Sequence, residues 1–262
     1  MTFRALIAIA ATVVIVGCGA DKPPDGLDVA GYTVDSKALG KEMPVDVVLP
    51  AGGGAGRPLL VFLHGRGGDE DSYLHGPMFD ALESLGRNAP IVAFPDGDED
   101  KYWHDRDSGA YGRYVVGEVI PLVARRFKAD RRRVAIGGIS MGGFGAFDLA
   151  RLSPGRFCAV GGHSPALWRS GGETAPGAFD DAEDFSRHDV IASAAAFAHI
   201  PVWLDAGDQD PFRPGDDAFA AALRAAGAHA TVRTWPGGHD GDYWDAHWRD
   251  YLRFYARGLR RC

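Results

Sequence analysis

Short, continuous apolar runs recur along the chain, and they constrain its fold more than any other feature. Runs of this length without polar alternation are typical of strands buried on both faces of a sheet. The clearest are Leu59–Leu63, Ile91–Phe94, Val134–Gly137, Phe157–Gly161 and Val202–Ala206. Further strand signals lie at Ala30–Asp35, Pro44–Leu49 and Thr231–Trp235.

Helical patterns lie between these runs. The expected helices are Met78–Gly86, Arg113–Phe127, Met141–Arg151, Asp216–Ala226 and Tyr243–Gly258. Strand and helix alternating at this spacing predict an α/β fold with a mostly parallel central sheet and helices on both faces. The Gly/Asp/Glu-rich stretch from Trp168 to Asp184 interrupts the alternation. We interpret it either as an excursion that contributes to a substrate-binding rim or as a plain surface loop.

The N-terminal segment is typical of an export signal. Residues 1–17 have a charged start, an apolar centre and a small-residue exit, which predict a signal peptide of the lipoprotein type. Their end, Ile15-Val16-Gly17-Cys18, resembles the bacterial lipobox, in which the Cys is lipidated. A plain signal peptide or a short membrane anchor is the alternative. Residues 18–30 are then a tether and residues 31–262 one domain, anchored by lipid on the outer face of a bacterial membrane, or secreted.

Charge and cysteine content exclude several classes of protein. The chain has 28 Lys+Arg against 35 Asp+Glu, a net charge of −7, which disfavours nucleic acid as a partner. Three Cys are too few for a disulfide scaffold, and Cys158 and Cys262 either pair or leave Cys158 free. No Cys-x-x-Cys or His-Glu-x-x-His pattern indicates structural zinc, so we expect neither a metal nor a cofactor.

The motif Gly138-Ile139-Ser140-Met141-Gly142 is the strongest functional signal. It follows a predicted strand and opens a predicted helix, which is the context of a nucleophile elbow. Small residues permit the sharp turn, and the amide of Met141 at the helix start can face a developing oxyanion. We predict Ser140 as the nucleophile. The alternative is a Gly-rich turn with an incidental Ser.

A serine nucleophile needs a base, which an acid orients. In this fold the order along the chain is Ser, then Asp or Glu, then His. His239 lies in a Gly-rich loop before the last predicted helix, and we predict it as the base. The acid should follow the strand at Val202–Ala206, where Asp210 is the first choice and Asp208 the second.

The oxyanion hole needs a second backbone donor. The stretch Leu63-His64-Gly65-Arg66-Gly67-Gly68 follows a buried strand, where that donor normally lies. We assign the donor to the amide of Arg66, with Gly67 as the alternative.

These motifs together resemble the Putative esterase family of the α/β-hydrolase superfamily. The family groups esterase D-like enzymes, feruloyl and acetyl xylan esterases and the mycolyltransferase antigens. The resemblance covers nearly all of residues 42–257 and implies a triad of Ser140, Asp210 and His239, with an oxyanion hole from the amides of Arg66 and Met141. The mycolyltransferase members use Glu as the acid, whereas this chain has an Asp.

The expected function is therefore a serine ester hydrolase that forms an acyl-enzyme on a small-molecule or glycan ester. Acyl transfer to a sugar or another alcohol is the alternative reaction, and a non-catalytic binding lipoprotein on the same fold is the alternative class. Two groups of aromatic residues have different expected roles. Residues that could line an acyl or aryl pocket are Tyr102, Trp103, His104, Tyr111 and Trp168, whereas the expected core residues are Trp203, Trp244 and Trp248.

Overall fold

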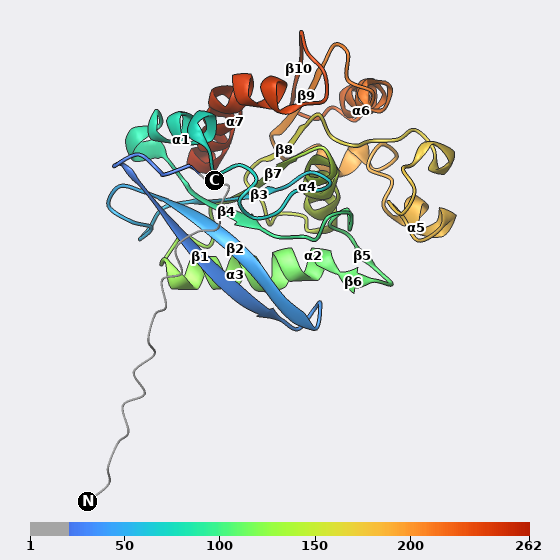
Figure 1. Ribbon diagram of the computed structural model, residues 1–262. Coiled ribbons are helices and arrows are strands. Elements are labelled where there is room, and N and C mark those ends of the chain that lie inside the picture. Colours follow the sequence, from blue (N-terminus) through green and yellow to red (C-terminus); the bar gives the residue numbers. More distant parts are fainter. Residues whose placement is uncertain (1–20) are drawn as a thin grey trace, which may run out of the picture.

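A twisted, mostly parallel sheet organises the protein, whose structure, a computed structural model, describes residues 21–262. Within these residues, eight strands follow the order β1-β2-β4-β3-β7-β8-β9-β10 (Figure 1). Their bounds are β1 Leu27–Ser36, β2 Lys41–Pro50, β3 Leu59–Leu63, β4 Ile91–Pro95, β7 Val134–Ile139, β8 Val160–His163, β9 Val202–Gly207 and β10 Ala230–Trp235. The pairs β1–β2 and β2–β4 are antiparallel, and all the others are parallel.

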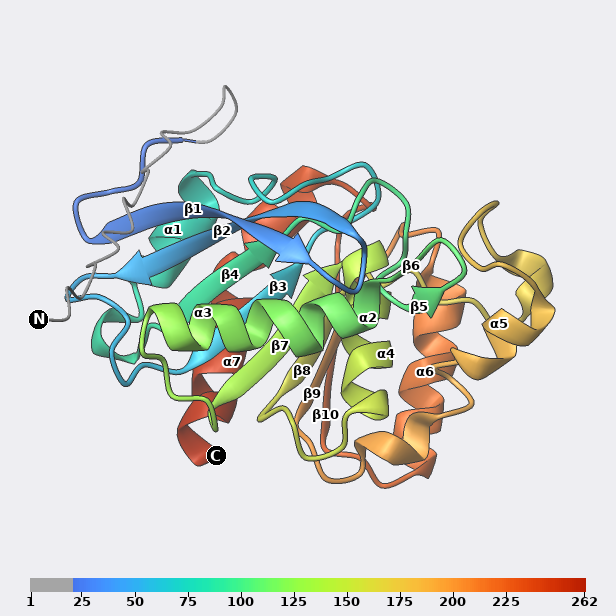
Figure 2. The ribbon, with the colours of Figure 1, turned by 90° about the horizontal axis from the view of Figure 1, so that it is seen from below.

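Helices cover both faces of the sheet, as the alternation predicts. On one face lie α1 and α7, and on the other lie α3, α4 and α6 (Figures 1 and 2). The helix bounds are α1 Gly76–Glu83, α2 Tyr111–Arg113, α3 Ile120–Arg126, α4 Met141–Leu152, α5 Ala182–Arg187, α6 Arg213–Ala225 and α7 Gly241–Arg261. A small hairpin is formed by β5 (Asp105–Arg106) and β6 (Gly109–Ala110). Each face therefore has its own apolar core.

Several boundaries differ from those predicted. The strand β1 begins at Leu27, inside the predicted tether. It begins there because every residue of β1 pairs with β2, and the pairing starts with Leu27 opposite Pro50. The strand β8 begins at Val160, three residues later than expected. The predicted helix Arg113–Phe127 contains a π-helical turn, Tyr114–Val119, between α2 and α3.

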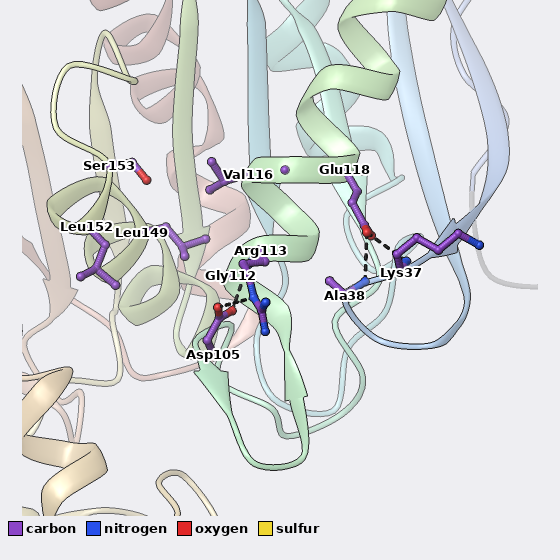
Figure 3. A pocket seen from close by; sticks show the side chains of 11 residues that line it. Lys37, Ala38, Asp105, Gly112, Arg113, Val116, Glu118, Leu149, Leu152 and Ser153 are labelled. Atoms are coloured by element: carbon purple, nitrogen blue, oxygen red, sulfur yellow. Dashed lines mark hydrogen bonds and ion pairs between the residues drawn. The ribbon is translucent and has the colours of Figure 1, made fainter.

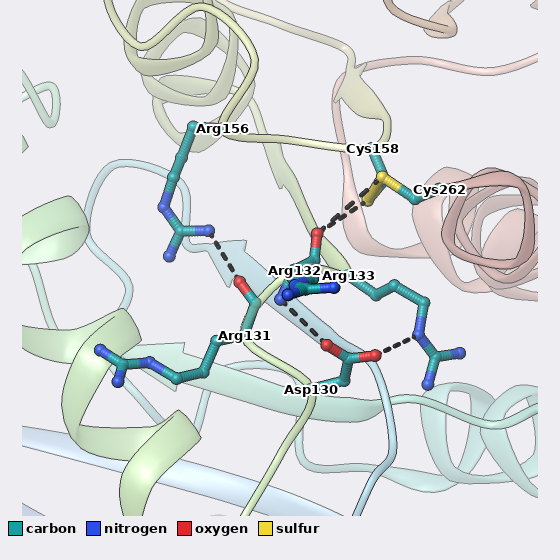
Figure 4. The surroundings of a disulfide bond; sticks show 7 residues. All are labelled: Asp130, Arg131, Arg132, Arg133, Arg156, Cys158 and Cys262. Carbon is teal, nitrogen blue, oxygen red and sulfur yellow. Dashed lines mark hydrogen bonds and ion pairs between the residues drawn. A yellow bond between two sulfur atoms is a disulfide. The ribbon is translucent and has the colours of Figure 1, made fainter.

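A disulfide bond joins Cys158 to Cys262 and resolves the alternatives left by the sequence. The two Cα atoms lie 5.6 Å apart, although the residues are separated by 104 positions. The bond ties the last residue of the chain, after α7, to the segment that enters β8. It lies beside the carbonyl oxygen of Arg132, and Arg131 and Arg156 are nearby (Figure 4).

The predicted signal peptide and Cys18 lie outside the described residues. Among residues 21–262, no helix has both the length and the apolar character needed to span a membrane.

Candidate active site

Ser140 lies in a tight turn between β7 and α4. Its backbone angles, φ 56° and ψ −115°, are unfavourable for a residue with a side chain and are typical of strain at functional sites. The turn is possible because the start of α4 packs very closely against the end of β3 and the segment that follows β8. A Cβ atom on Gly142 would lie only 2.0 Å from the carbonyl oxygen of Leu63, and one on Gly143 would lie 2.9 Å from Pro165. Both glycines therefore permit the packing that holds Ser140 in place.

The three side chains predicted from chain order meet in one hydrogen-bonded line. Nε2 of His239 lies 2.8 Å from Oγ of Ser140, and Nδ1 lies 2.9 Å from Oδ2 of Asp210. The residues follow the carboxyl ends of β7, β9 and β10, which lie at the same edge of the parallel sheet. With Nδ1–H donating to the carboxylate, Nε2 is left as the acceptor for the serine hydroxyl.

The geometry separates the two candidate acids. Asp210 is buried, and its other oxygen, Oδ1, accepts a hydrogen bond from the amide of Phe212 at 2.8 Å. Asp208 is exposed, and its Oδ1 accepts from the amide of Gly237 at 3.1 Å. Asp210 thus contacts the imidazole, whereas Asp208 supports the loop that leads to it.

The geometry also separates the candidate oxyanion donors. The amide of Gly67 donates to the carbonyl oxygen of Glu99 at 2.7 Å, so the alternative donor is already occupied. The amide of Arg66 has no hydrogen-bond partner among the described residues. Met141 is the first residue of α4, and an amide in that position has no partner within its helix. The amides of Arg66 and Met141 thus remain available to a ligand.

His64 and Tyr73 hold the loop that carries Arg66. Nδ1 of His64 donates to the carbonyl oxygen of Gly65 at 2.8 Å, and Nε2 accepts from the amide of Gly97 at 2.9 Å. The amide of Gly65 donates to the hydroxyl of Tyr73 at 3.1 Å. Burial raises the pKa of Tyr73, so its hydroxyl stays protonated. Sequence reasoning missed Tyr73, because only the folded loop shows its contact.

A second buried carboxyl group lies near the acid. Both oxygens of Asp216, on α6, lack a hydrogen-bond partner within residues 21–262. Burial, followed by the charges of Asp210 and Asp205, raises the pKa of Asp216 well above its usual value. The raised pKa favours the neutral form of Asp216, which reduces the negative charge close to Asp210.

The hollow above Ser140 has a volume of about 580 Å³. Tyr102, Phe212 and Trp244 give it aromatic walls, while Arg66 and His75 supply polar groups. Tyr102 lines the hollow as predicted, although little of it is exposed. The other residues predicted for the pocket do not line it: Trp103, His104, Tyr111 and Trp168. Trp244, which we expected in the core, is half-buried and lines the pocket because it lies on the first turn of α7, beside His239.

Another hollow of about 620 Å³ lies between α4 and the π-helical turn (Figure 3). Its lining includes the ion pair of Asp105 and Arg113 and the side chain of Glu118, which accepts hydrogen bonds from the amides of Lys37 and Ala38. This hollow is not lined by Ser140, His239 or Asp210. The chemistry therefore belongs to the hollow above Ser140.

Comparisons with known proteins agree with this architecture. Residues 36–255 match the family described as Putative esterase. Esterase Rv1288 of Mycobacterium tuberculosis is 27% identical over 251 residues, which cover 79% of this chain and 55% of that protein. The chain thus spans about half the length of the curated relatives that it matches.

Solved structures extend the likeness to the fold. A ferulic acid esterase has a TM-score of 0.77 at 23% identity, covering 88% of this chain and 98% of the other. An S-formylglutathione hydrolase from Agrobacterium tumefaciens has a TM-score of 0.79 at 20% identity, covering 91% and 98%. These structures confirm the predicted α/β-hydrolase fold. The family match covers nearly the whole sheet and includes Ser140, Asp210 and His239. We therefore conclude that this protein belongs to the Putative esterase family.

Proposed function

We propose that this protein hydrolyses a carboxylic ester through an acyl-enzyme on Ser140. The observation that carries the proposal is the unbroken line from Asp210 through His239 to Ser140, which ends beside two available backbone amides. Membership of an esterase family supports the same reaction class.

The reaction follows from the geometry. Nε2 of His239 takes the hydroxyl proton while Oγ of Ser140 attacks the ester carbonyl, and the amides of Arg66 and Met141 stabilise the oxyanion. The imidazolium then returns the proton to the departing alcohol, which leaves an acyl-serine. Water, deprotonated by His239, attacks this ester, and the carboxylic acid leaves as Ser140 regains its proton. Asp210 orients the imidazole and stabilises its charged form.

The pocket favours substrates of modest size with an apolar or aromatic portion. Its aromatic walls can stack on an aryl or acyl group, and Arg66 can attract a carboxylate or a polar oxygen. The names of the ferulic acid esterase and the S-formylglutathione hydrolase describe an ester of an aromatic acid and a small thioester. We therefore propose a small-molecule or glycan ester as the substrate.

The deciding experiment combines labelling and turnover. A fluorophosphonate probe should label the wild-type protein at Ser140, and a panel of p-nitrophenyl esters, feruloyl esters and acetylated sugars should identify the ester cleaved. Failure to label Ser140, with no turnover across the panel, would instead support a non-catalytic binding protein. Product analysis with an added alcohol acceptor separates hydrolysis from acyl transfer.

We also propose that the enzyme is exported and held at a bacterial membrane by lipid on Cys18. The support is the apolar segment that ends in Val16-Gly17-Cys18. One acyl chain gives only marginal binding, so stable anchoring requires several. The variant Cys18→Ala should leave the membrane fraction, and its N-terminal mass should lack lipid. Unchanged fractionation and mass would refute the anchor.

A further inference from the structure

A buried cluster of His104, Asp184 and His188 lies apart from the candidate active site. One donor atom from each of the three lies within 4.8 Å of the others. His104 precedes β5, whereas Asp184 and His188 lie on and just after α5. The side chains of His104 and Asp184 have no exposed surface, and that of His188 is 9% exposed. Such a group of imidazoles around a carboxylate, shielded from water, needs a physical explanation.

Within residues 21–262, only one ring nitrogen of His188 forms a hydrogen bond. Nδ1 lies 2.8 Å from Oδ2 of Asp148, on α4, and therefore carries the proton. The lone pair of Nε2 then faces Oδ1 of Asp184 at 3.6 Å, so an acceptor faces an acceptor. A carboxylate behind a histidine, with the other nitrogen left free, is the usual arrangement around a metal-binding histidine.

His104 shows the same pattern from the opposite side. Nδ1 lies 3.3 Å from the carbonyl oxygen of Tyr102, and Nε2 lies 3.0 Å from Oδ2 of Asp184. Both partners are acceptors, but a neutral imidazole has a single N–H to donate. If a cation replaced the Nε2 proton, Nδ1–H could donate to Tyr102, and the lone pair of Nε2 would point towards the same carboxylate that His188 faces. A cation among these atoms would satisfy both imidazoles and Asp184 together.

The spacing fits a small cation with tetrahedral ligands. Zinc bonds of about 2.0–2.1 Å at tetrahedral angles place neighbouring ligand atoms roughly 3.3 Å apart. The two observed N···O distances, 3.0 Å to Oδ2 and 3.6 Å to Oδ1 of Asp184, lie near that value. With one atom from each residue the separations reach at most 4.8 Å, so small side-chain rotations would bring the three onto one ion. Two imidazoles and a carboxylate suit zinc, whereas magnesium and calcium prefer oxygen ligands alone.

The two nearby arginines each have a carboxylate partner outside the three proposed ligands. Arg151 pairs with Asp148 at 2.6 Å. Arg187 contacts Oδ1 of Asp184 at 3.2 Å, but it is half-exposed and also reaches Glu183 at 3.2 Å. It can thus keep a carboxylate partner while Asp184 binds a metal. The amide of Asp180 donates to Oδ2 of Asp184 at 2.9 Å, which would orient a coordinating carboxylate.

We propose that His104, Asp184 and His188 bind one zinc ion, with Asp148 orienting His188. The ion has a structural role, because it joins α5 to the loop that carries Tyr102 and, through Asp148, to α4. These are the elements beside the catalytic pocket, in which Tyr102 forms a wall. The site goes beyond the esterase reaction and does not depend on it.

The first test uses the wild-type protein. After incubation with zinc and gel filtration, we expect about one zinc per chain and a midpoint of thermal unfolding about 5–10 °C above that of the chelator-treated protein. Cobalt(II) in place of zinc should give the intense visible absorption of a four-coordinate site. If the protein retained no zinc and showed no thermal shift, the proposal would be refuted, and the cluster would be held by hydrogen bonds alone.

Variants locate the metal. His188→Gln and His104→Gln should each lose the cobalt absorption and retain less than about a tenth of the zinc. The matched control is His229→Gln, which replaces an exposed histidine elsewhere and should keep both signals. Zinc retained in full by both cluster variants would place it elsewhere and overturn the assignment. Fluorophosphonate labelling of Ser140 reports separately on the proposed esterase.

Discussion

The amide of Ser140 donates a hydrogen bond to the carbonyl oxygen of His163, with 2.9 Å between nitrogen and oxygen. His163 ends β8, and its Nδ1 lies 2.7 Å from Oδ1 of Asp205 on β9. The same carboxylate accepts three further hydrogen bonds, from Trp203 (2.6 Å), Tyr243 (2.9 Å) and Tyr251 (3.0 Å). The nucleophile turn therefore rests on a buried polar network that joins β8, β9 and α7.

Loss of Asp205 should destabilise the fold strongly. Asp205→Ala leaves four buried donors without their acceptor, and we expect the free energy of unfolding to fall by about 3–5 kcal/mol in urea denaturation. Tyr255→Phe is the comparison, because it removes only the hydroxyl that donates to Nε2 of His163 at 2.9 Å. It should cost about 1 kcal/mol. Equal costs for the two variants would mean that Asp205 is not the centre of the network.

Ser140 and His239 should act as one unit. Ser140→Ala and His239→Ala should each lower kcat by about 10⁴-fold or more, and the double variant should be little worse than either. Circular dichroism should show an unchanged fold, because both side chains line the hollow and neither belongs to the apolar cores. Effects that multiply in the double variant would contradict the shared role, and wild-type turnover in Ser140→Ala would leave the elbow as only a tight turn.

The two neighbouring acids give a sharper comparison. Asp210→Asn should lower kcat by about 10³–10⁴-fold, because the amide no longer fixes the tautomer of His239. Asp208→Asn should have a much smaller effect, because its carboxylate contacts only the amide of Gly237. Ester turnover measured for both variants in parallel decides the matter. A severe loss in Asp208→Asn alone would reassign the acid.

Much of the fold could be predicted because its signals are local. The run Leu59–Leu63 is apolar on both faces, and the structure confirms it as β3 without a shift. The start of β1 could not be predicted, because the residues from Leu27 become a strand only by pairing with β2. The π-helical turn at Tyr114–Val119 was also missed, since nothing in its composition separates it from an α-helix.

In the candidate site, too, some features could be predicted from the sequence and others appear only in the folded protein. Chain order was enough to select His239, and the structure places it against Ser140. The choice between Arg66 and Gly67 depended on a hydrogen bond from Gly67 to the distant Glu99, which no local pattern reveals. The cluster around Asp184 was invisible for the same reason, because its two imidazoles come from separate segments of the chain.

The disulfide bond should contribute substantially to stability. It closes a span of 104 residues, so the oxidised unfolded chain has fewer conformations available than the reduced one. Cys262→Ser should lower the free energy of unfolding by about 2–4 kcal/mol. Dithiothreitol should destabilise the wild-type protein by a similar amount and leave the variant unchanged. Sensitivity of the variant to the reductant would indicate an effect outside this bond.

Asp46, on β2, should make stability depend on pH. Burial raises the pKa of its carboxyl from 3.8 to about 6, and the charges of Asp71 and Asp69 add to the shift. The folded protein therefore binds this proton more tightly than the unfolded chain does. The group favours the folded state at low pH, and this contribution is lost as the pH rises from about 4 through 6.

Asp46→Asn should remove that dependence, because the amide has a similar shape and no charge. Above pH 7 we expect the variant to be more stable than the wild type by about 1 kcal/mol. This is less than a pKa shift of about two units would give for a fully buried group, because solvent screens the charge of this partly exposed carboxyl. Below about pH 3 the carboxyl is largely protonated in both the folded and the unfolded protein, and the advantage should vanish. Urea denaturation at about pH 3 and pH 8 measures both values, and an equal gain at the two would point to packing rather than to charge.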